Sequence, residues 1–307
     1  MAKTIGVVLS HRVSVALVDE HRLDGPIRSF PQSDDENEAG LVELHTEALV
    51  RTICEQVMAV VGTAPASAGI SAVGVSLPGI VKHGVVEDSP NIPQLKGARI
   101  AELLGAELKH SGLNTSVHVL NDADAVAAGL AAATGKLDQL IRVWTLGVGI
   151  GYGRYPFAEG VFEGGHSTVS LDDKEKYCGC GGRGHIEGIM GHRAMRLRFL
   201  DMEPEEIFAT ARQSGHSKDV TRCKEFVHLW HKALAAGIAT CIHQDGAGKF
   251  LITGFNARFV DIGLLKEYCH QMVKMSPLQG YTIEVVEDNA ETRILGSAVA
   301  AEQAARL

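Results

Sequence analysis

The stretch VHVLNDADAVAAGLAAATG, residues 117–135, places an apolar β-branched run directly before a helix built from small residues. Asn121 and Asp122 favour a helix N-terminus, and Gly135 favours its end. The stretch that follows, LIRVWTLGVGIGYGRY (140–155), predicts a strand, a glycine turn and a second strand. Strands that alternate with helices and end in glycine turns indicate an α/β fold with layered, mostly covered sheets.

The same alternation extends in both directions from this stretch. Toward the N-terminus, TIGVVLSHRVSVALVDE (4–20) predicts a hairpin, residues 41–61 predict a helix, and ISAVGVSLPGIV (70–81) predicts a strand. Toward the C-terminus the pattern predicts long helices over about 191–247, a strand over 249–255 and a helix over 291–307. The whole chain therefore fits one α/β architecture.

Composition excludes several classes of protein. A chain of 307 residues and 32.7 kDa favours two lobes with one cleft rather than a small binding module. No apolar run approaches the roughly 18 residues of a membrane span, and the N-terminus lacks the pattern of a secretory signal, so we expect a cytoplasmic protein without a membrane partner. A net charge of −8 argues against a nucleic-acid partner.

The six cysteines fall into two groups. Cys178 and Cys180 lie only two residues apart and need a separate explanation. The others stand singly in helix-like or apolar segments, where reduced buried thiols are expected: Cys54, Cys223, Cys241 and Cys269.

Residues 163–188, EGGHSTVSLDDKEKYCGCGGRGHIEG, carry the spacing of a metal site. His166, Cys178, Cys180 and His185 are separated by 11, 1 and 4 residues, and the glycines between them allow tight turns. Two thiolates and two neutral imidazoles balance the charge of Zn²⁺, and four protein ligands leave no open position. We therefore predict a structural zinc; the alternative is a glycine-rich loop with two exposed thiols.

Two carboxylates flank the predicted ligands. Glu163 lies three residues before His166, and Glu187 lies two residues after His185. A metal would hold both carboxylates in place, and carboxylates facing a cleft are suited to accept hydrogen bonds from sugar hydroxyls. Taken alone, they could also be surface carboxylates on a metal loop.

At these residues the chain resembles the ROK family, the bacterial sugar kinases and sugar-responsive repressors. Residues 163–187 are similar to the family's Glu-x-Gly-His element followed by Cys-x-Cys-Gly-x-x-Gly-Cys-x-Glu, with His185 in place of the last cysteine. Weaker matches agree in order and spacing: VSLPGIV (75–81), DSPNIPQLKG (88–97), NDADAVAAG (121–129), LGVGIG (146–151) and ILGSAVAA (294–301).

The resemblance implies a two-domain RNase H-like, actin-like fold with a cleft between the domains and a structural zinc loop. It places a smaller domain over residues 1–121 plus the C-terminal helix at about 289–307, and a larger domain over 122–288 with the zinc loop at 163–187. It also suggests a homodimer.

The resemblance further implies roles for individual residues. Asp122 would be the general base, and the set in contact with the sugar would be Asn91, Asn121, Asp122, Glu163, His166 and Glu187. His166 would use one ring nitrogen for zinc and offer the other to a sugar hydroxyl. From the residues alone, Asn121-Asp122-Ala123-Asp124 also fits a helix cap. Nucleotide contacts would fall on Gly147, Gly149, Gly151 and Gly254.

The ATP side departs from the family pattern. The first phosphate element, Asp-x-Gly-Gly-Thr, corresponds to Val7-Val8-Leu9-Ser10-His11, which lacks both the acid and the glycine pair. The second, Gly-Thr-Gly, appears as Gly147-Val148-Gly149, and the adenosine-side cluster appears as Gly254-Phe255-Asn256. We therefore expect Mg-ATP, the cofactor that the resemblance implies, to bind more weakly than in a kinase with intact elements.

Three functions remain open from the sequence. The first is a hexose-type sugar kinase that transfers phosphate from ATP to a sugar hydroxyl. The second is a pseudokinase or sugar sensor that keeps the sugar site without ATP use. The third is a glycoside hydrolase that uses two carboxylates among Asp122, Glu163 and Glu187. In each case the partner is a small-molecule sugar or glycoside.

Overall fold

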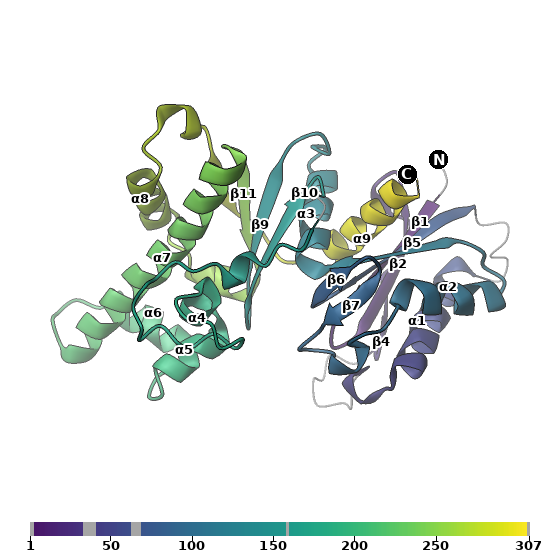
Figure 1. Cartoon of the computed structure of the whole chain (residues 1–307), viewed down its shortest axis with the longest axis horizontal. Helices are drawn as coiled ribbons and strands as arrows, with labels where there is room; N and C mark the ends of the chain where they lie inside the picture. Colours follow the sequence, from purple (N-terminus) through teal and green to yellow (C-terminus); the bar gives the residue numbers. More distant parts are fainter. Residues whose placement is uncertain (1–2, 33–40, 63–68, 158–159, 306–307) are drawn as a thin grey trace. The chain divides into compact units, whose positions relative to one another are not determined.

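The computed structural model describes residues 3–32, 41–62, 69–157 and 160–305. The chain forms two compact units, coloured along the sequence in Figure 1. Unit 1 comprises Met1–Gln139, Gly153–Val161 and Asn289–Leu307, and unit 2 comprises Leu140–Tyr152 and Phe162–Asp288. Both units combine sheet and helix, which confirms the predicted α/β class.

Unit 1 contains a six-stranded sheet among the described residues. Its order is β3-β2-β1-β5-β8, and β4 pairs with β2. β1 and β2 are antiparallel, as the predicted hairpin requires, whereas β1–β5 and β5–β8 are parallel. The strands are β1 (Lys3–Leu9), β2 (Val13–Asp19), β3 (Arg22–Leu23), β4 (Arg28–Phe30), β5 (Ile70–Leu77) and β8 (Ser116–Asn121); a separate ribbon pairs β6 (Ile80–Lys82) with β7 (Val85–Asp88).

Helices cover both faces of this sheet. Alternate side chains of β1 face opposite sides, so Val7 joins the core formed with α1 (Thr46–Val61) and α2 (Ile100–His110), while Val8 packs against α9 (Ala290–Ala304). α3 (Asp122–Ala133) lies beside α9 (Figure 1), and the short helices η1 (Leu41–Glu43) and η3 (Pro93–Leu95) lie in the connections.

Glycines allow α9 to approach the sheet closely. Gly6 and Gly74 are paired neighbours in β1 and β5, and a Cβ on either would lie 2.1 or 1.8 Å from a carbonyl oxygen of α9. Gly129 of α3 and Gly296 of α9 face each other's helix backbone in the same way. These contacts place α3 in unit 1, whereas the boundary expected from the sequence lay between residues 121 and 122.

Unit 2 is built on a four-stranded sheet of order β10-β9-β11-β12 within its described residues. β9 (Ile141–Leu146), β11 (Lys249–Thr253) and β12 (Thr282–Val285) run parallel, and β10 (Ile150–Tyr155) continues into unit 1. The helices are α4 (Ile186–Met190), α5 (His192–Arg198), α6 (Pro204–Ala211), α7 (Lys218–Asp245) and α8 (Ile262–Met272), with η4 (Gly164–His166), η5 (Phe255–Phe259) and η6 (Ser276–Leu278) between them.

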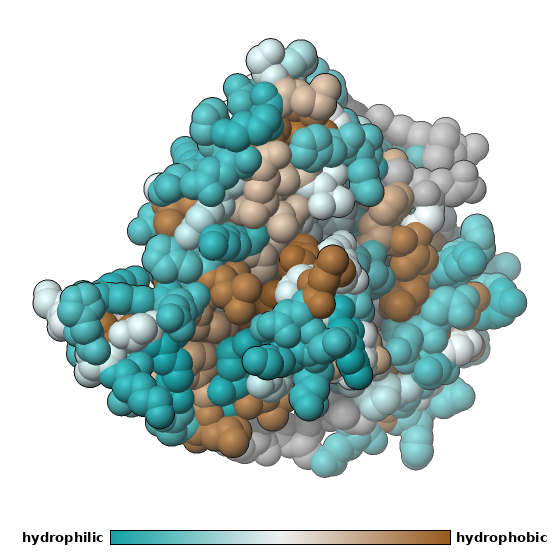
Figure 2. Space-filling model, turned by 60° about the vertical axis from the view of Figure 1, so that its left-hand side comes forward, coloured by the Kyte–Doolittle hydropathy of each residue, from teal (hydrophilic) through white to brown (hydrophobic). Residues whose placement is uncertain are grey.

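An aromatic-rich core holds unit 2 together. Trp144 of β9 and Trp230 of α7 are buried, and Phe208 stacks on Phe259 with ring centroids 4.3 Å apart. Hydrophilic side chains cover much of the face seen in Figure 2, interrupted by hydrophobic groups. Within the described residues, no helix combines the length and the apolar composition that a bilayer span requires.

Candidate functional site

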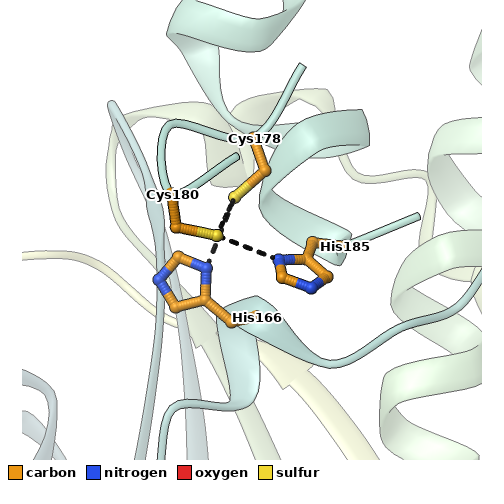
Figure 3. A group of neighbouring side chains, drawn as sticks. All are labelled: His166, Cys178, Cys180 and His185. Atoms are coloured by element: carbon orange, nitrogen blue, oxygen red, sulfur yellow. Dashed lines mark hydrogen bonds between the residues drawn. The ribbon is translucent and has the colours of Figure 1, made fainter. Parts of the chain in front are cut away.

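The predicted metal ligands converge in unit 2 (Figure 3). Cys178 Sγ lies 3.4 Å from His166 Nδ1 and 3.3 Å from Cys180 Sγ, and Cys180 Sγ lies 3.3 Å from His185 Nδ1. All four donor atoms lie within 4.8 Å of one another. A tetrahedral zinc with bonds of about 2.0–2.3 Å separates its ligands by about 3.3–3.8 Å. The donor set therefore fits a tetrahedral cation of the zinc type.

Backbone contacts shape the loop that carries these ligands. Thr168 and His185 form an antiparallel bridge, and Gly184 N–H donates to the carbonyl of Glu175 at 2.7 Å. Gly184 has a positive φ, and a Cβ there would lie 1.8 Å from Ser170 O. Glycine is therefore required at this position for the loop to close.

A buried ion pair fastens the loop to α5. The Arg198 guanidinium donates to both carboxylate oxygens of Glu175, at 3.0 Å for Nη1 to Oε1, and both side chains are largely shielded from water. The same guanidinium lies over the rings of Tyr177 and Phe226. This bidentate ion pair holds the middle of the loop through contacts that do not involve the predicted metal ligands.

The environment sets the protonation of the ligands. Burial raises the pKa of the Cys178 thiol to about 12. Burial, and the neighbouring His166, lower the pKa of His185, which keeps that imidazole neutral. Neutral histidine is already the ligand form, whereas Cys178 must release its proton when a cation binds.

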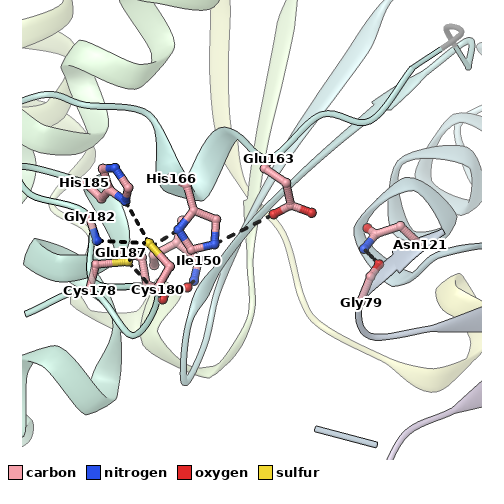
Figure 4. Close-up of polar contacts among 10 residues, drawn as sticks. All are labelled: Gly79, Asn121, Ile150, Glu163, His166, Cys178, Cys180, Gly182, His185 and Glu187. Carbon is pink, nitrogen blue, oxygen red and sulfur yellow. Dashed lines mark hydrogen bonds and ion pairs between the residues drawn. The ribbon is translucent and has the colours of Figure 1, made fainter. Parts of the chain in front are cut away.

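The flanking carboxylates have different surroundings (Figure 4). Glu163 is exposed, and its Oε2 lies 3.9 Å from Nε2 of His166, the ring nitrogen that faces away from the cysteines. Glu187 is half-buried, and its Oε2 accepts a hydrogen bond from the backbone N–H of Ile150 at 3.2 Å. Its other oxygen lies 3.5 Å from Cys178 Sγ.

The glycine turns predicted for the nucleotide meet at one edge of the unit 2 sheet. β9 and β11 are parallel neighbours, so Gly147 and Gly254, which follow them, lie side by side. Asn256 Nδ2 donates to Gly147 O at 3.0 Å, and a Cβ at Gly254 would lie 2.5 Å from Leu146 O. The carboxyl ends of parallel strands are where α/β proteins bind ligands. Gly149 belongs to the same turn, and Gly151 lies in β10.

In unit 1, Asn121 ends β8 and caps α3. Its side-chain carbonyl accepts from Ala123 N–H at 2.8 Å. Its side-chain amide donates to Gly79 O, also at 2.8 Å (Figure 4). Asp122 is the first residue of α3, is half-buried and also accepts from Ala123 N–H. The helix-cap interpretation of Asn121 is therefore confirmed. The two hydrogen bonds of its side chain fix the backbone next to Asp122.

Asn91 lies in an exposed turn of unit 1 between β7 and η3. Ser89, two residues earlier, donates to Pro78 O at 2.6 Å. Gly79, next to that proline, accepts from Asn121. These hydrogen bonds connect the turn of Asn91 to the carboxyl end of β8.

The first hairpin differs in register from the match made on its sequence. β1 runs through Leu9, which is buried, and the turn consists of Ser10, His11 and Arg12, with Ser10 N–H donating to Arg12 O at 3.0 Å. Ser10 and His11, rather than Leu9 and Ser10, therefore occupy the turn. Val7 is a fully buried strand residue, so the stretch Val7–His11 is strand for its first three residues.

A cavity of about 620 Å³ opens elsewhere in unit 2, between α6, α7 and the start of α8. Phe208, Lys224, His228 and Asp261 are among its lining residues. None of the residues predicted from the sequence for sugar, nucleotide or metal lines it.

The sequence model of the ROK family matches residues 34–254. The chain belongs to the ROK family. A glucokinase from Pyrobaculum calidifontis is 31% identical to this ROK protein over 189 residues, and the chain spans 57% of that glucokinase's length.

Solved structures show that this ROK protein has the actin-like ATPase fold expected from the resemblance. The ROK hexokinase from Thermus thermophilus superposes with a TM-score of 0.77 at 21% identity, covering 99% of both chains. A ROK family glucokinase from Streptomyces griseus, solved with glucose and AMPPNP, has a TM-score of 0.64 at 21% identity, covering 98% of this chain and 99% of that one.

Sequence reasoning missed two contacts of this ROK protein. The Glu175–Arg198 pair and the Glu187–Ile150 hydrogen bond both join residues more than 20 positions apart, and neither follows a helical or strand period. The one relevant sequence feature is that Glu175 lies in a loop with few apolar residues. A carboxylate in such a loop is usually exposed, so this feature does not indicate the buried ion pair.

Proposed function

We propose that this protein is a sugar kinase that transfers the terminal phosphoryl group of ATP to a hydroxyl of a hexose-type sugar. Its membership of the ROK family and the 31% identity with a glucokinase support this function. The observation that carries the proposal is the position of Asp122 directly after strand β8. The preceding residue, Asn121, is held by hydrogen bonds through both the nitrogen and the oxygen of its side-chain amide.

In this proposal Asp122 is the general base. A carboxylate at the end of a strand can accept the proton of a sugar hydroxyl as that oxygen attacks phosphorus. Catalysis of phosphoryl transfer depends mostly on positioning, so a carboxylate held by a capped helix start suits the role.

The sugar hydroxyls would be recognised by Asn91, Asn121, Glu163, His166 and Glu187 together with Asp122. His166 is arranged for two tasks, because Nδ1 faces the cysteines and Nε2 faces Glu163. With Nδ1 bound to a cation, the ring would keep its proton on Nε2 and donate it to a hydroxyl or to Glu163.

The metal in this proposal is a structural zinc held by His166, Cys178, Cys180 and His185. Four protein ligands leave no position for an activated water, so the ion would fix the loop rather than take part in the reaction. The nucleotide would lie over Gly147, Gly149, Gly151 and Gly254, with Mg²⁺ accompanying its phosphates.

The altered hairpin predicts weak nucleotide binding. Ser10 and His11 place Cβ atoms in the turn where the family has a glycine pair, and no acid precedes them at the matched position. Two lost contacts of about 1.5–3 kcal/mol each would shift a micromolar affinity into the millimolar range.

Asp122→Asn tests the proposal directly. We expect sugar affinity to remain within a few-fold of the parent and turnover to fall about 100-fold or more, the usual scale for a general base. Calorimetry with a panel of hexoses and with Mg-ATP gives the affinities, and a coupled ADP assay gives turnover. Asp124→Asn is the matched control, because Asp124 accepts from Arg154 N–H and an asparagine oxygen can do the same.

Equal turnover in Asp122→Asn and Asp124→Asn would contradict the role of Asp122. The second candidate, a sugar-binding protein without phosphoryl transfer, is favoured by one observation, the non-glycine turn at Ser10-His11. Hexose binding without Mg-ATP binding, even at millimolar nucleotide, would establish that candidate in place of the kinase.

A further inference from the structure

Glu187 contacts the glycine turn predicted for phosphate as well as the metal loop. Its Oε2 accepts from Ile150 N–H at 3.2 Å, and a Cβ at Gly149 would lie 2.4 Å from the same oxygen. The carboxylate therefore lies directly against the turn backbone, and a side chain at position 149 would have to displace it.

The opposite side of Glu187 faces the cysteine cluster. Its Oε1 lies 3.5 Å from Cys178 Sγ, and Gly188, the next residue, packs against the backbone of Cys178 so closely that a Cβ there would lie 2.8 Å from Cys178 N. His185, a predicted ligand, is the N-cap residue of α4, which carries Glu187. Predicted metal ligands therefore contact Glu187 both through its side chain and through its helix.

The residues after α4 hold the rest of the turn. Gly191 N–H donates to Glu187 O at 2.9 Å, His192 N–H donates to Gly147 O at 3.1 Å, and Arg193 N–H points to Val148 O at 3.4 Å. The path from the cysteine cluster to the turn is thus made of direct contacts within unit 2.

α4 has too few residues to be stable by itself. It spans Ile186–Met190, and a helix of one turn depends on the contacts at its ends. One end of α4 follows the ligand His185, and the other leads into the segment that bonds to Gly147. Fixing His185 and Cys178 therefore fixes the orientation of Glu187.

We propose that Glu187 is a positioning residue through which metal loading of the Cys178–Cys180 loop orders the Gly147–Gly149 turn. The metal loop would thereby control the nucleotide side of unit 2 in addition to its expected sugar contacts. The link to nucleotide rests on the proposed function.

Hydrogen exchange of the full chain, followed by mass spectrometry, tests this coupling without requiring nucleotide. Three samples are compared: zinc-loaded parent, chelator-stripped parent and zinc-loaded Glu187→Ala. We expect peptides covering residues 147–152 to exchange about tenfold faster in the stripped parent and in Glu187→Ala. Glu187→Gln should restore protection, because its amide oxygen can still accept from Ile150 N–H.

Glu163→Ala is the matched control, since it removes the other carboxylate of the same loop, whose Oε2 lies 3.9 Å from His166 Nε2, whereas Glu187 accepts from Ile150 N–H. It should keep zinc and leave 147–152 protected. The β12 peptide, 282–285, reports on unfolding of unit 2 as a whole. If removal of zinc unfolds unit 2, the zinc-loaded Glu187→Ala sample alone tests the coupling, because that variant keeps all four predicted ligands.

Unchanged exchange at 147–152 in zinc-loaded Glu187→Ala would overturn the proposal. The same holds if stripping loosens the loop but leaves the turn protected. A parallel calorimetric titration with Mg-ATP separates a failure of the proposed kinase function from a failure of the proposed coupling. If no nucleotide binds, the kinase function is contradicted, while the exchange result still tests the coupling through Glu187.

Discussion

The metal loop of unit 2 and the first hairpin of unit 1 are held in opposite ways. Between residues 167 and 183 of the loop, all of which are described, the only buried residues are Glu175 and Cys178. In the hairpin, nearly every strand residue is buried, including Ile5, Val7 and Leu9. The loop depends on polar contacts and ligands for its shape, whereas the hairpin depends on apolar packing.

This difference explains why the two sequence motifs carry different information. The hairpin keeps its antiparallel register although it lacks the family's acid and glycine pair, because the packing that holds it does not involve the turn. The loop has no comparable apolar support, so its ligand residues and its shape are linked. A correctly folded hairpin is therefore no evidence that the chain binds nucleotide. A correctly assembled ligand cluster, in contrast, indicates that the loop has its folded shape.

Removing both thiols from the loop should have the largest effect. We expect Cys178→Ser/Cys180→Ser to lower zinc affinity at least about 1,000-fold, because two of four strong ligands are lost, and metal content to fall from about one ion per chain to below about a tenth. Metal analysis of the purified protein gives the stoichiometry, and competition with a chromogenic chelator gives the affinity.

Cys54→Ser is the control for losing a thiol. Cys54 is buried in unit 1, outside the metal cluster, and its sulfur lies 3.5 Å from Ser111 Oγ, a contact that serine can keep. It should retain a full complement of zinc. If the double variant also retained zinc, the cluster would not be the metal site and the contrast between loop and hairpin would lose its basis.

Much of this molecule could be predicted from the sequence where one physical pattern dominates. The β-branched runs of residues 4–20 predict a hairpin because burial on both faces requires them, and the structure confirms it. The spacing of His166, Cys178, Cys180 and His185 predicts a cluster because few other constraints place two cysteines and two histidines among glycines, and the four donor atoms do meet.

The rest depends on contacts that no local pattern encodes. The turn at Ser10, His11 and Arg12 was predictable, because these residues separate the two apolar runs, and the structure confirms it. The match of the family's glycine pair to Leu9-Ser10 was not, because burial of Leu9 in β1 follows from packing rather than from a local pattern. α3 joins unit 1 because Gly129 and Gly296 let α3 and α9 touch, and those residues are 167 positions apart in the chain. The second role of Glu187 likewise depends on Ile150, 37 residues away.

Leu9→Ala tests whether apolar packing holds the hairpin. Leu9 is almost completely buried in the core shared with α1 and α2, so truncation should lower the free energy of unfolding by about 2–5 kcal/mol. Urea denaturation followed by far-UV circular dichroism measures the change.

The matched control replaces the turn itself, as Ser10→Gly/His11→Gly. His11 is exposed and Ser10 is half-buried, so stability should stay within about 1 kcal/mol of the parent. Removing the two Cβ atoms should also tighten Mg-ATP binding if the turn faces phosphate. A destabilisation by the glycine pair as large as that of Leu9→Ala would show that the turn, rather than the core, holds the hairpin.

The smallest expected effect concerns acid, which acts on the metal ligands and on the core of unit 2. His231 of α7 is fully buried; its Nδ1 lies 2.8 Å from Val227 O, and its Nε2 accepts from Asp261 N–H at 2.9 Å. Both nitrogens are satisfied only in the neutral ring, and burial lowers the pKa of His231. The unfolded chain, with an ordinary histidine pKa of about 6.5, takes up a proton that the folded chain refuses.

The stability due to neutral His231 is therefore fully present above about pH 6.5 and is lost as the pH falls below it. Between pH 7.5 and 5.5 the loss should be about 1 kcal/mol, and His231→Gln, which cannot titrate, should lose that much less over the same range. Both tryptophans of the chain, Trp144 and Trp230, lie in unit 2, so fluorescence-monitored denaturation reports this unit alone. Protonation of the metal ligands affects parent and variant alike and cancels in the difference. Identical pH dependence in the two proteins would mean that acid does not act on unit 2 through His231.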